Sequence, residues 1–157
     1  MHCFHGSKYS NTINASRDGN GLRIATAGDA VLRCLATVFA DDFKSQWDED
    51  GIKTPFIFKR DGFACEGQVA RRAVQNRLLA SLFDHMQLSS FLIDPPVKMS
   101  NRQKGTILEY LIARLYEIRG DDARLAELLL SCLTQVLLWL AICDIELDRR
   151  FLTPLHR

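Results

Sequence analysis

Two acidic residues in helix-like segments are the side chains of this sequence that could do metal chemistry. Asp29 lies within residues 22–39 and Glu109 lies within residues 106–118, and both segments have the apolar spacing of helices. Two such helices facing each other could direct these side chains to one point, where carboxylates bind Mg²⁺ or Mn²⁺. The two residues would supply two carboxylates to such a site.

The same acids also fit ordinary structural roles. Asp29 and Arg33 are four residues apart and could form a surface ion pair. Glu109 could be a solvated residue of its helix. Residue type and spacing therefore leave open both a metal site and plain surface charges.

A group of basic residues is the candidate contact for RNA phosphates, which cations bind without reading sequence. The chain's net charge is only +1, so an RNA-binding surface would have to gather its positive charge on one face. The alternative is a solvated face balanced by nearby acids. The candidates are Arg71, Arg72, Arg77, Lys98, Arg102 and Lys104.

The cysteines and the first residues indicate the cellular setting. Five scattered cysteines with no CxxC pair argue against a disulfide framework or a structural zinc site. Reduced thiols in an intracellular, reducing compartment are the favoured interpretation. Residues 1–21 are polar and lack the apolar core of a signal peptide, so a flexible N-terminal arm is predicted.

The elements that must position these residues are predicted to be helices. Apolar residues recur at helical steps over residues 22–39, 68–85, 106–118 and 123–147. Ser100 is a plausible cap before the third helix, and Gly120 is expected to end it. Residues 41–60 are predicted to be a loop, with a short β-like candidate at 55–58. The pattern predicts an all-α domain over residues 22–157.

The last predicted helix is apolar on nearly every side. Residues 128–143 fall short of the ~20 apolar residues that cross a bilayer, so a buried or subunit-facing helix is favoured over a membrane span. Trp139 and Leu140 are expected in the core. Because one domain of this size can hardly bury the whole helix, a homodimer contact or a partner-protein groove is also expected.

Three segments resemble the ribonuclease III domain family. In residues 23–32, Gly-Asp-Ala-Val-Leu at 28–32 matches the end of the family's signature helix. Residues 72–80 are similar to its Val-Ser-Asn-x-x-Leu-Ala segment. Residues 104–120 resemble its Asp-x-x-Glu-Ala-Leu-Ile-Gly-Ala-Ile-Tyr helix. Order and rough spacing agree over about residues 22–130.

The resemblance implies a homodimeric helical fold that hydrolyses double-stranded RNA with Mg²⁺ or Mn²⁺. Catalytic members use two acids in the first segment and two in the third. Asp29 and Glu109 match one of each, whereas Ala25 and Thr106 replace the others. Thr26 replaces a phenylalanine that supports dimer packing in the family. Acids that could stand in for the missing ligands are Asp41, Asp42, Glu66 and Glu117.

Three functions remain open from the sequence. The first is a metal-dependent endoribonuclease acting on double-stranded RNA with an incomplete acidic site. The second is a catalytically inactive module of the same fold that binds RNA or protein and serves assembly. The third is an unrelated helical bundle with other chemistry in the same pocket, which would be favoured if Asp29 and Glu109 lay far apart.

Overall fold

The computed structural model describes residues 19–50, 64–92, 95–118 and 120–152, and the described part contains helices and no strand. The predicted all-α class is therefore confirmed for this part of the chain. The β-like candidate at 55–58 lies outside the described residues. The elements are α2 (Gly19–Asp50), α3 (Ala64–Ala73), α4 (Asn76–His85), the 3-10 helix η2 (Leu88–Phe91), α5 (Asn101–Glu117), the 3-10 helix η3 (Gly120–Asp122) and α6 (Ala123–Leu152).

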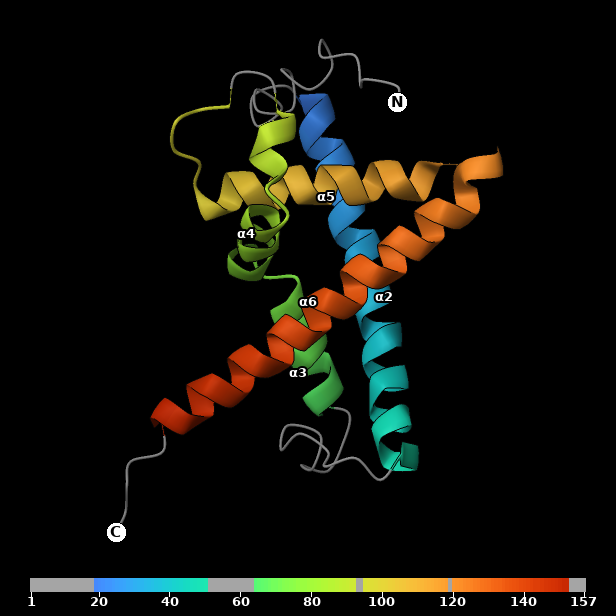
Figure 1. Ribbon diagram of the computed structural model, residues 1–157, viewed down its shortest axis with the longest axis vertical. Helices are drawn as coiled ribbons and strands as arrows, with labels where there is room; N and C mark the ends of the chain where they lie inside the picture. The colour runs from blue at the N-terminus through green and yellow to red at the C-terminus, as the bar shows by residue number, and fades with distance from the viewer. Residues whose placement is uncertain (1–18, 51–63, 93–94, 119, 153–157) are drawn as a thin grey trace.

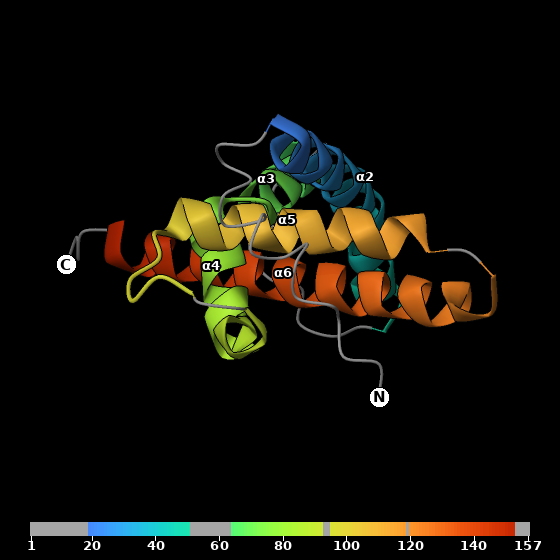
Figure 2. The ribbon, with the colours of Figure 1, turned by 90° about the horizontal axis from the view of Figure 1, so that it is seen from above.

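The long helices cross one another rather than running side by side (Figure 1). The contact between α2 and α5 is the most extensive one in the fold. Helix α6 runs diagonally across α2 and α3 and packs against both. Seen from above, α5 lies between α2 and α6 (Figure 2). The candidate acids of α2 and α5 therefore belong to the two helices with the closest association.

The buried stripe of α2 consists mainly of small residues. Ala25, Gly28, Leu32, Ala36 and Ala40 are buried at steps of three or four. Ala27 and Val38, two apolar residues of the helix predicted over 22–39, are exposed. Small side chains let neighbouring backbones come close, so the helix is rotated toward its alanines and glycine.

Two predicted boundaries are wrong. Helix α2 begins at Gly19 and continues to Asp50 through the first half of the predicted loop, where no glycine or proline interrupts it. The single helix predicted over 68–85 is two helices, because Gln75 is extended at φ −73° and ψ 138°. This turn directs the apolar faces of both α3 and α4 to the core, where Val69 and Leu79 are fully buried.

The Ser100 cap predicted for α5 is confirmed, although the helix begins at Asn101, five residues before the predicted range of 106–118. The Ser100 hydroxyl accepts a hydrogen bond from the Gln103 amide, and the Ser100 amide donates to the Gln103 side chain at 2.9 Å. This capping box satisfies two amides that the first helical turn leaves without partners. Gly120 follows the helix with φ +79°, a conformation that glycine adopts without strain.

Helix α6 has one buried and one exposed apolar face. Leu130, Leu137, Leu138 and Ala141 belong to the core, whereas Trp139, predicted to be in the core, is 47% exposed. The stretch Gly120–Asp148 is the one segment of the described helices that is long and apolar enough to cross a membrane, with 39% of its apolar window buried. Core helices of soluble proteins can be equally long and apolar.

Candidate functional site

The candidate site lies where α2 crosses α5. A Cβ atom added to Gly28 would stand 1.8 Å from the backbone oxygen of Glu109 and 3.1 Å from the amide nitrogen of Ala113. Only a residue without a side chain permits this approach. Because Asp29 is the next residue of α2, the crossing brings the two candidate acids to one place, as the sequence predicted.

Asp29 is already engaged by a cation. The Arg33 Nε donates a 2.8 Å hydrogen bond to an Asp29 oxygen, which is the ion pair expected from their spacing. This hydrogen bond, together with the charges of Asp29 and Glu109, holds the pKa of the Arg33 guanidinium above its usual range. Any metal ion at Asp29 would have to compete with Arg33.

Glu109 is half-buried beside this pair. Burial and, to a smaller extent, the negative charge of Asp29 raise its pKa from 4.5 to about 7, while Arg33 acts in the opposite direction. A carboxyl group with such a pKa is partly protonated at neutral pH. A cation placed between Asp29 and Glu109 would stabilise the ionised form of both.

Glu109 should therefore make the folded protein less stable as pH rises. Its folded-state pKa lies above the unfolded value, so the cost is absent below about pH 4.5, grows between 4.5 and 7, and is complete above 7. We expect Glu109→Gln to be more stable than the wild type at pH 8 and to lose this advantage at pH 4. Urea unfolding at both pH values measures the difference.

The control for this measurement is Glu117→Gln, which removes an exposed carboxylate from the end of the same helix. It should show no comparable gain at pH 8. Equal stability of Glu109→Gln and the wild type at pH 8 would contradict the burial cost.

Ala25 and Thr106, which the resemblance singled out as substituted positions, do not contribute carboxylates. Ala25 is 1% exposed, so its methyl group is enclosed in the core, and Thr106 is half-buried. Among the proposed replacements, Asp41 and Asp42 are exposed, and Glu117 forms a 2.7 Å ion pair with Arg114. The side chain of Glu66 lies outside the described residues. The described part of the chain contains no group of three or more histidine, cysteine, aspartate or glutamate side chains that is placed to hold a metal ion.

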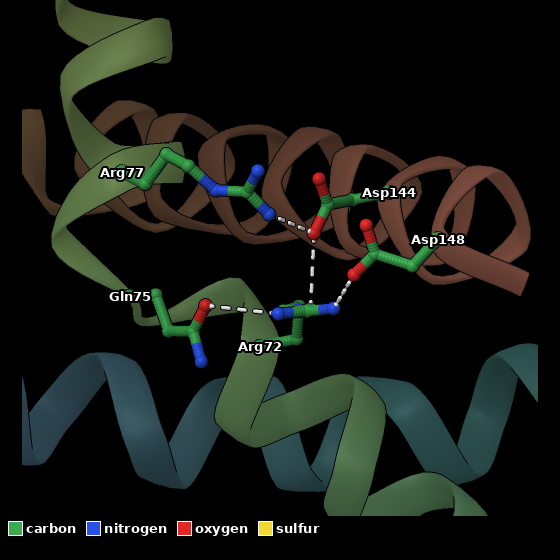
Figure 3. A network of polar contacts seen from close by, with 5 residues as sticks. All are labelled: Arg72, Gln75, Arg77, Asp144 and Asp148. Atoms are coloured by element: carbon green, nitrogen blue, oxygen red, sulfur yellow. Dashed lines mark hydrogen bonds and ion pairs between the residues drawn. The ribbon is translucent and has the colours of Figure 1, made fainter. Parts of the chain in front are cut away.

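Three of the six candidate RNA-binding cations are neutralised by acids of this chain. Arg72 pairs with Asp148 and, at 3.0 Å, with Asp144, which also binds Arg77 (Figure 3). This network fastens the α3–α4 turn to α6. Lys104 pairs with Asp84 at 2.6 Å. These three cations act within the fold, in agreement with the alternative of charges balanced by nearby acids.

The other three cations form no ion pair with another described residue, and Arg71 is distant in sequence from the neighbouring pair Lys98 and Arg102. Arg71 donates a 3.0 Å hydrogen bond to the Gly67 carbonyl oxygen on α3. Lys98 and Arg102 are exposed where the chain enters α5. Arg71 and Arg33 line an open groove of about 420 Å³ between α2 and α3.

The network partners Asp144 and Asp148 were missed from the sequence. Their spacing of four residues places them on one face of α6, which is a detectable signal. The sequence does not show which cations these acids bind, because Arg72 and Arg77 are about seventy residues away in the chain.

Cys3 and the side chain of Cys65 lie outside the described residues. Cys34, Cys132 and Cys143 are free and exposed.

Comparison with known proteins found no relative of this chain. No family model matches it, and no curated protein or solved structure matches it.

Proposed function

We propose that this chain is a ribonuclease III-like domain that serves as a binding and assembly module and has lost efficient cleavage of double-stranded RNA. The resemblance of three segments in the same order, over about residues 22–130, supports the kinship. The helical architecture and the close crossing of the first and third segments are compatible with it.

The observation that carries this proposal is that only two acids, Asp29 and Glu109, are present and that Asp29 is already bound by Arg33. In-line attack on a phosphodiester by a metal-bound water needs divalent ions held beside the substrate. Asp29 and Glu109 could hold one Mg²⁺ or Mn²⁺ together with water, but Arg33 already binds Asp29. Losing an outer-shell partner of a metal site already costs about 10–100-fold in affinity or activity, and here two ligands themselves are replaced.

A second candidate is a slow, metal-dependent endoribonuclease, and one observation favours it. The two family acids that remain lie at the same helix crossing, and the charge of Asp29 acts on Glu109. In this function Asp29 and Glu109 would hold the ion, which would supply an activated water and stabilise developing negative charge. Arg71 would contact the phosphate backbone from the groove beside Arg33.

Incubation of the purified chain with labelled double-stranded RNA in Mg²⁺ or Mn²⁺ tests both candidates. We expect no cleavage product from the wild type. Cleavage that is lost in both Asp29→Asn and Glu109→Gln would overturn the proposal and establish the second candidate. Cleavage that both variants retain would exclude an active site at the acid pair.

The double variant Ala25→Glu with Thr106→Asp gives a gain-of-function arm. Because Ala25 is enclosed, circular dichroism must first show that the variant keeps its helices. Cleavage gained by a folded double variant would show that the domain still presents RNA to this crossing. The quadruple combination with Asp29→Asn and Glu109→Gln is the matched negative control.

A further inference from the structure

Arg33 lies beside both acids of the α2–α5 crossing. It follows Asp29 by one helical turn, and its Nε donates the 2.8 Å hydrogen bond to an Asp29 oxygen. Glu109 reaches the same place from α5, because its backbone and that of Gly28 are too close to admit a side chain. The hydrogen bond with Asp29 raises the pKa of Arg33, burial lowers it, and the charges of Asp29 and Glu109 raise it. The guanidinium therefore interacts with carboxylates from two helices.

An ordinary pair of helical neighbours lacks this second acid. Arg114 and Glu117 of α5 form such a pair at 2.7 Å, with side chains that are 45% and 55% exposed. A further hydrogen-bond partner of Arg114 is the Tyr110 hydroxyl rather than a second carboxylate. At the crossing, the Asp29 side chain is only 27% exposed and Glu109 is half-buried. A counter-charge matters more there, because the acids are less solvated.

The charges at the crossing bear on any metal ion that would bind there. Two carboxylates with no counter-charge would match the two positive charges of Mg²⁺ or Mn²⁺. With the Arg33 guanidinium in place, one of the two negative charges is already balanced, and a divalent ion would stand beside a positive charge. The Arg33 hydrogen bond also occupies an Asp29 oxygen that a metal ion would need. The side chains present therefore fit the guanidinium better than they fit a divalent ion.

We infer that the Arg33 guanidinium takes the place of a divalent metal ion as the counter-charge of Asp29 and Glu109, so that the crossing is neutralised by a cation of the chain itself. The inference rests on the proposed loss of cleavage, for which it supplies a cause. It also implies a latent site. Removal of the guanidinium should leave two carboxylates that bind a hard divalent cation, because carboxylate oxygens are the ligands that such ions take.

Binding of Mn²⁺ to the full-length chain tests this inference, with the paramagnetic resonance signal of free Mn²⁺ as the readout. We expect Arg33→Gln to bind one Mn²⁺ at least about 10-fold more tightly than the wild type does, because the repelling charge is gone. Arg33→Lys keeps a positive charge and should bind Mn²⁺ no better than the wild type. Adding Asp29→Asn to Arg33→Gln removes a ligand and should abolish the gain.

The matched control is Arg114→Gln, which removes a guanidinium from the exposed pair with Glu117 and should leave Mn²⁺ binding unchanged. Nuclear magnetic resonance locates the bound ion. In Arg33→Gln, Mn²⁺ should broaden the backbone amide signals of Gly28 and Glu109 more strongly than it does in the wild type. Circular dichroism shows whether each variant keeps its helices, which we expect for Arg33→Gln because the Arg33 side chain is 57% exposed.

Two results would overturn the inference. If the wild type binds Mn²⁺ as tightly as Arg33→Gln does, the guanidinium does not take the place of the ion. If a folded Arg33→Gln binds no Mn²⁺, the two acids do not form a cation site. Neither result changes the cleavage assay, in which cleavage of RNA by the wild type would overturn the proposed function whatever the affinity for Mn²⁺.

Discussion

Gly28→Ala is expected to lower the free energy of unfolding by up to about 3 kcal/mol, the upper part of the range for overpacked cores. The new Cβ would stand 1.8 Å from the Glu109 backbone oxygen, and backbone cannot rotate away as a flexible side chain can. The two helices must separate to admit the methyl group, and their contact is the most extensive one in the fold. Urea-induced unfolding followed by circular dichroism measures the loss.

Gly67→Ala is the matched control for this substitution. Gly67 also lies within a helix, and a Cβ added there meets no atom within 4 Å. Alanine should therefore stabilise α3 by about 0.5–1 kcal/mol through its higher helix propensity. If both variants are equally stable, the close approach of α2 and α5 is wrong.

The Gly28 substitution also bears on the acid pair. Separating α2 from α5 moves Asp29 away from Glu109 and gives the Glu109 carboxyl more water. Both changes favour the ionised carboxylate, so the pKa of Glu109 should fall from about 7 toward its ordinary value. An NMR titration of the Glu109 carboxyl carbon in a folded Gly28→Ala sample measures this coupling between packing and electrostatics.

Phe83→Ala is expected to cost about 3–5 kcal/mol, the range for truncating a buried aromatic ring. Phe83 on α4 is 0% exposed and is among the largest fully buried side chains of the described residues. Its removal leaves a cavity that its helical neighbours can fill only in part. Chemical denaturation at constant pH measures the effect.

Phe91→Ala removes the same ring from a position that is 77% exposed, so its effect should stay within about 0.5 kcal/mol. Since Phe83→Ala could consume most of the stability of a small domain, Phe83→Leu provides a measurable intermediate of at most about 1.5 kcal/mol. A Phe83→Ala variant as stable as Phe91→Ala would show that α4 does not pack on the core as described.

The helical class and several helix ends were predictable from the sequence because they depend on local chemistry. Apolar residues at three- and four-residue steps indicate helices, Ser100 with Gln103 forms a cap, and Gly120 accepts a positive φ. The ion pair of Asp29 and Arg33 is equally local, since helical neighbours four residues apart meet whatever the rest of the chain does.

Other features of the fold depend on contacts between segments that are distant in sequence. The spacing of apolar residues does not say which side of α2 faces α5. The exposure of Val38 and the burial of Ala25 therefore became clear only once the crossing of the two helices was known. The division of residues 68–85 into two helices arose in the same way, because one straight helix could not direct both apolar faces to the core.

By itself, the sequence determined that the chain forms helices and that Asp29 and Glu109 each lie in one of them. The tertiary structure decided that these acids share one crossing, that Arg72, Arg77 and Lys104 are neutralised, and that one apolar face of α6 is exposed. The physical reason is the separation along the chain over which each kind of interaction acts. Backbone hydrogen bonds and caps act within a few residues, whereas burial and charge pairing depend on which distant helices meet.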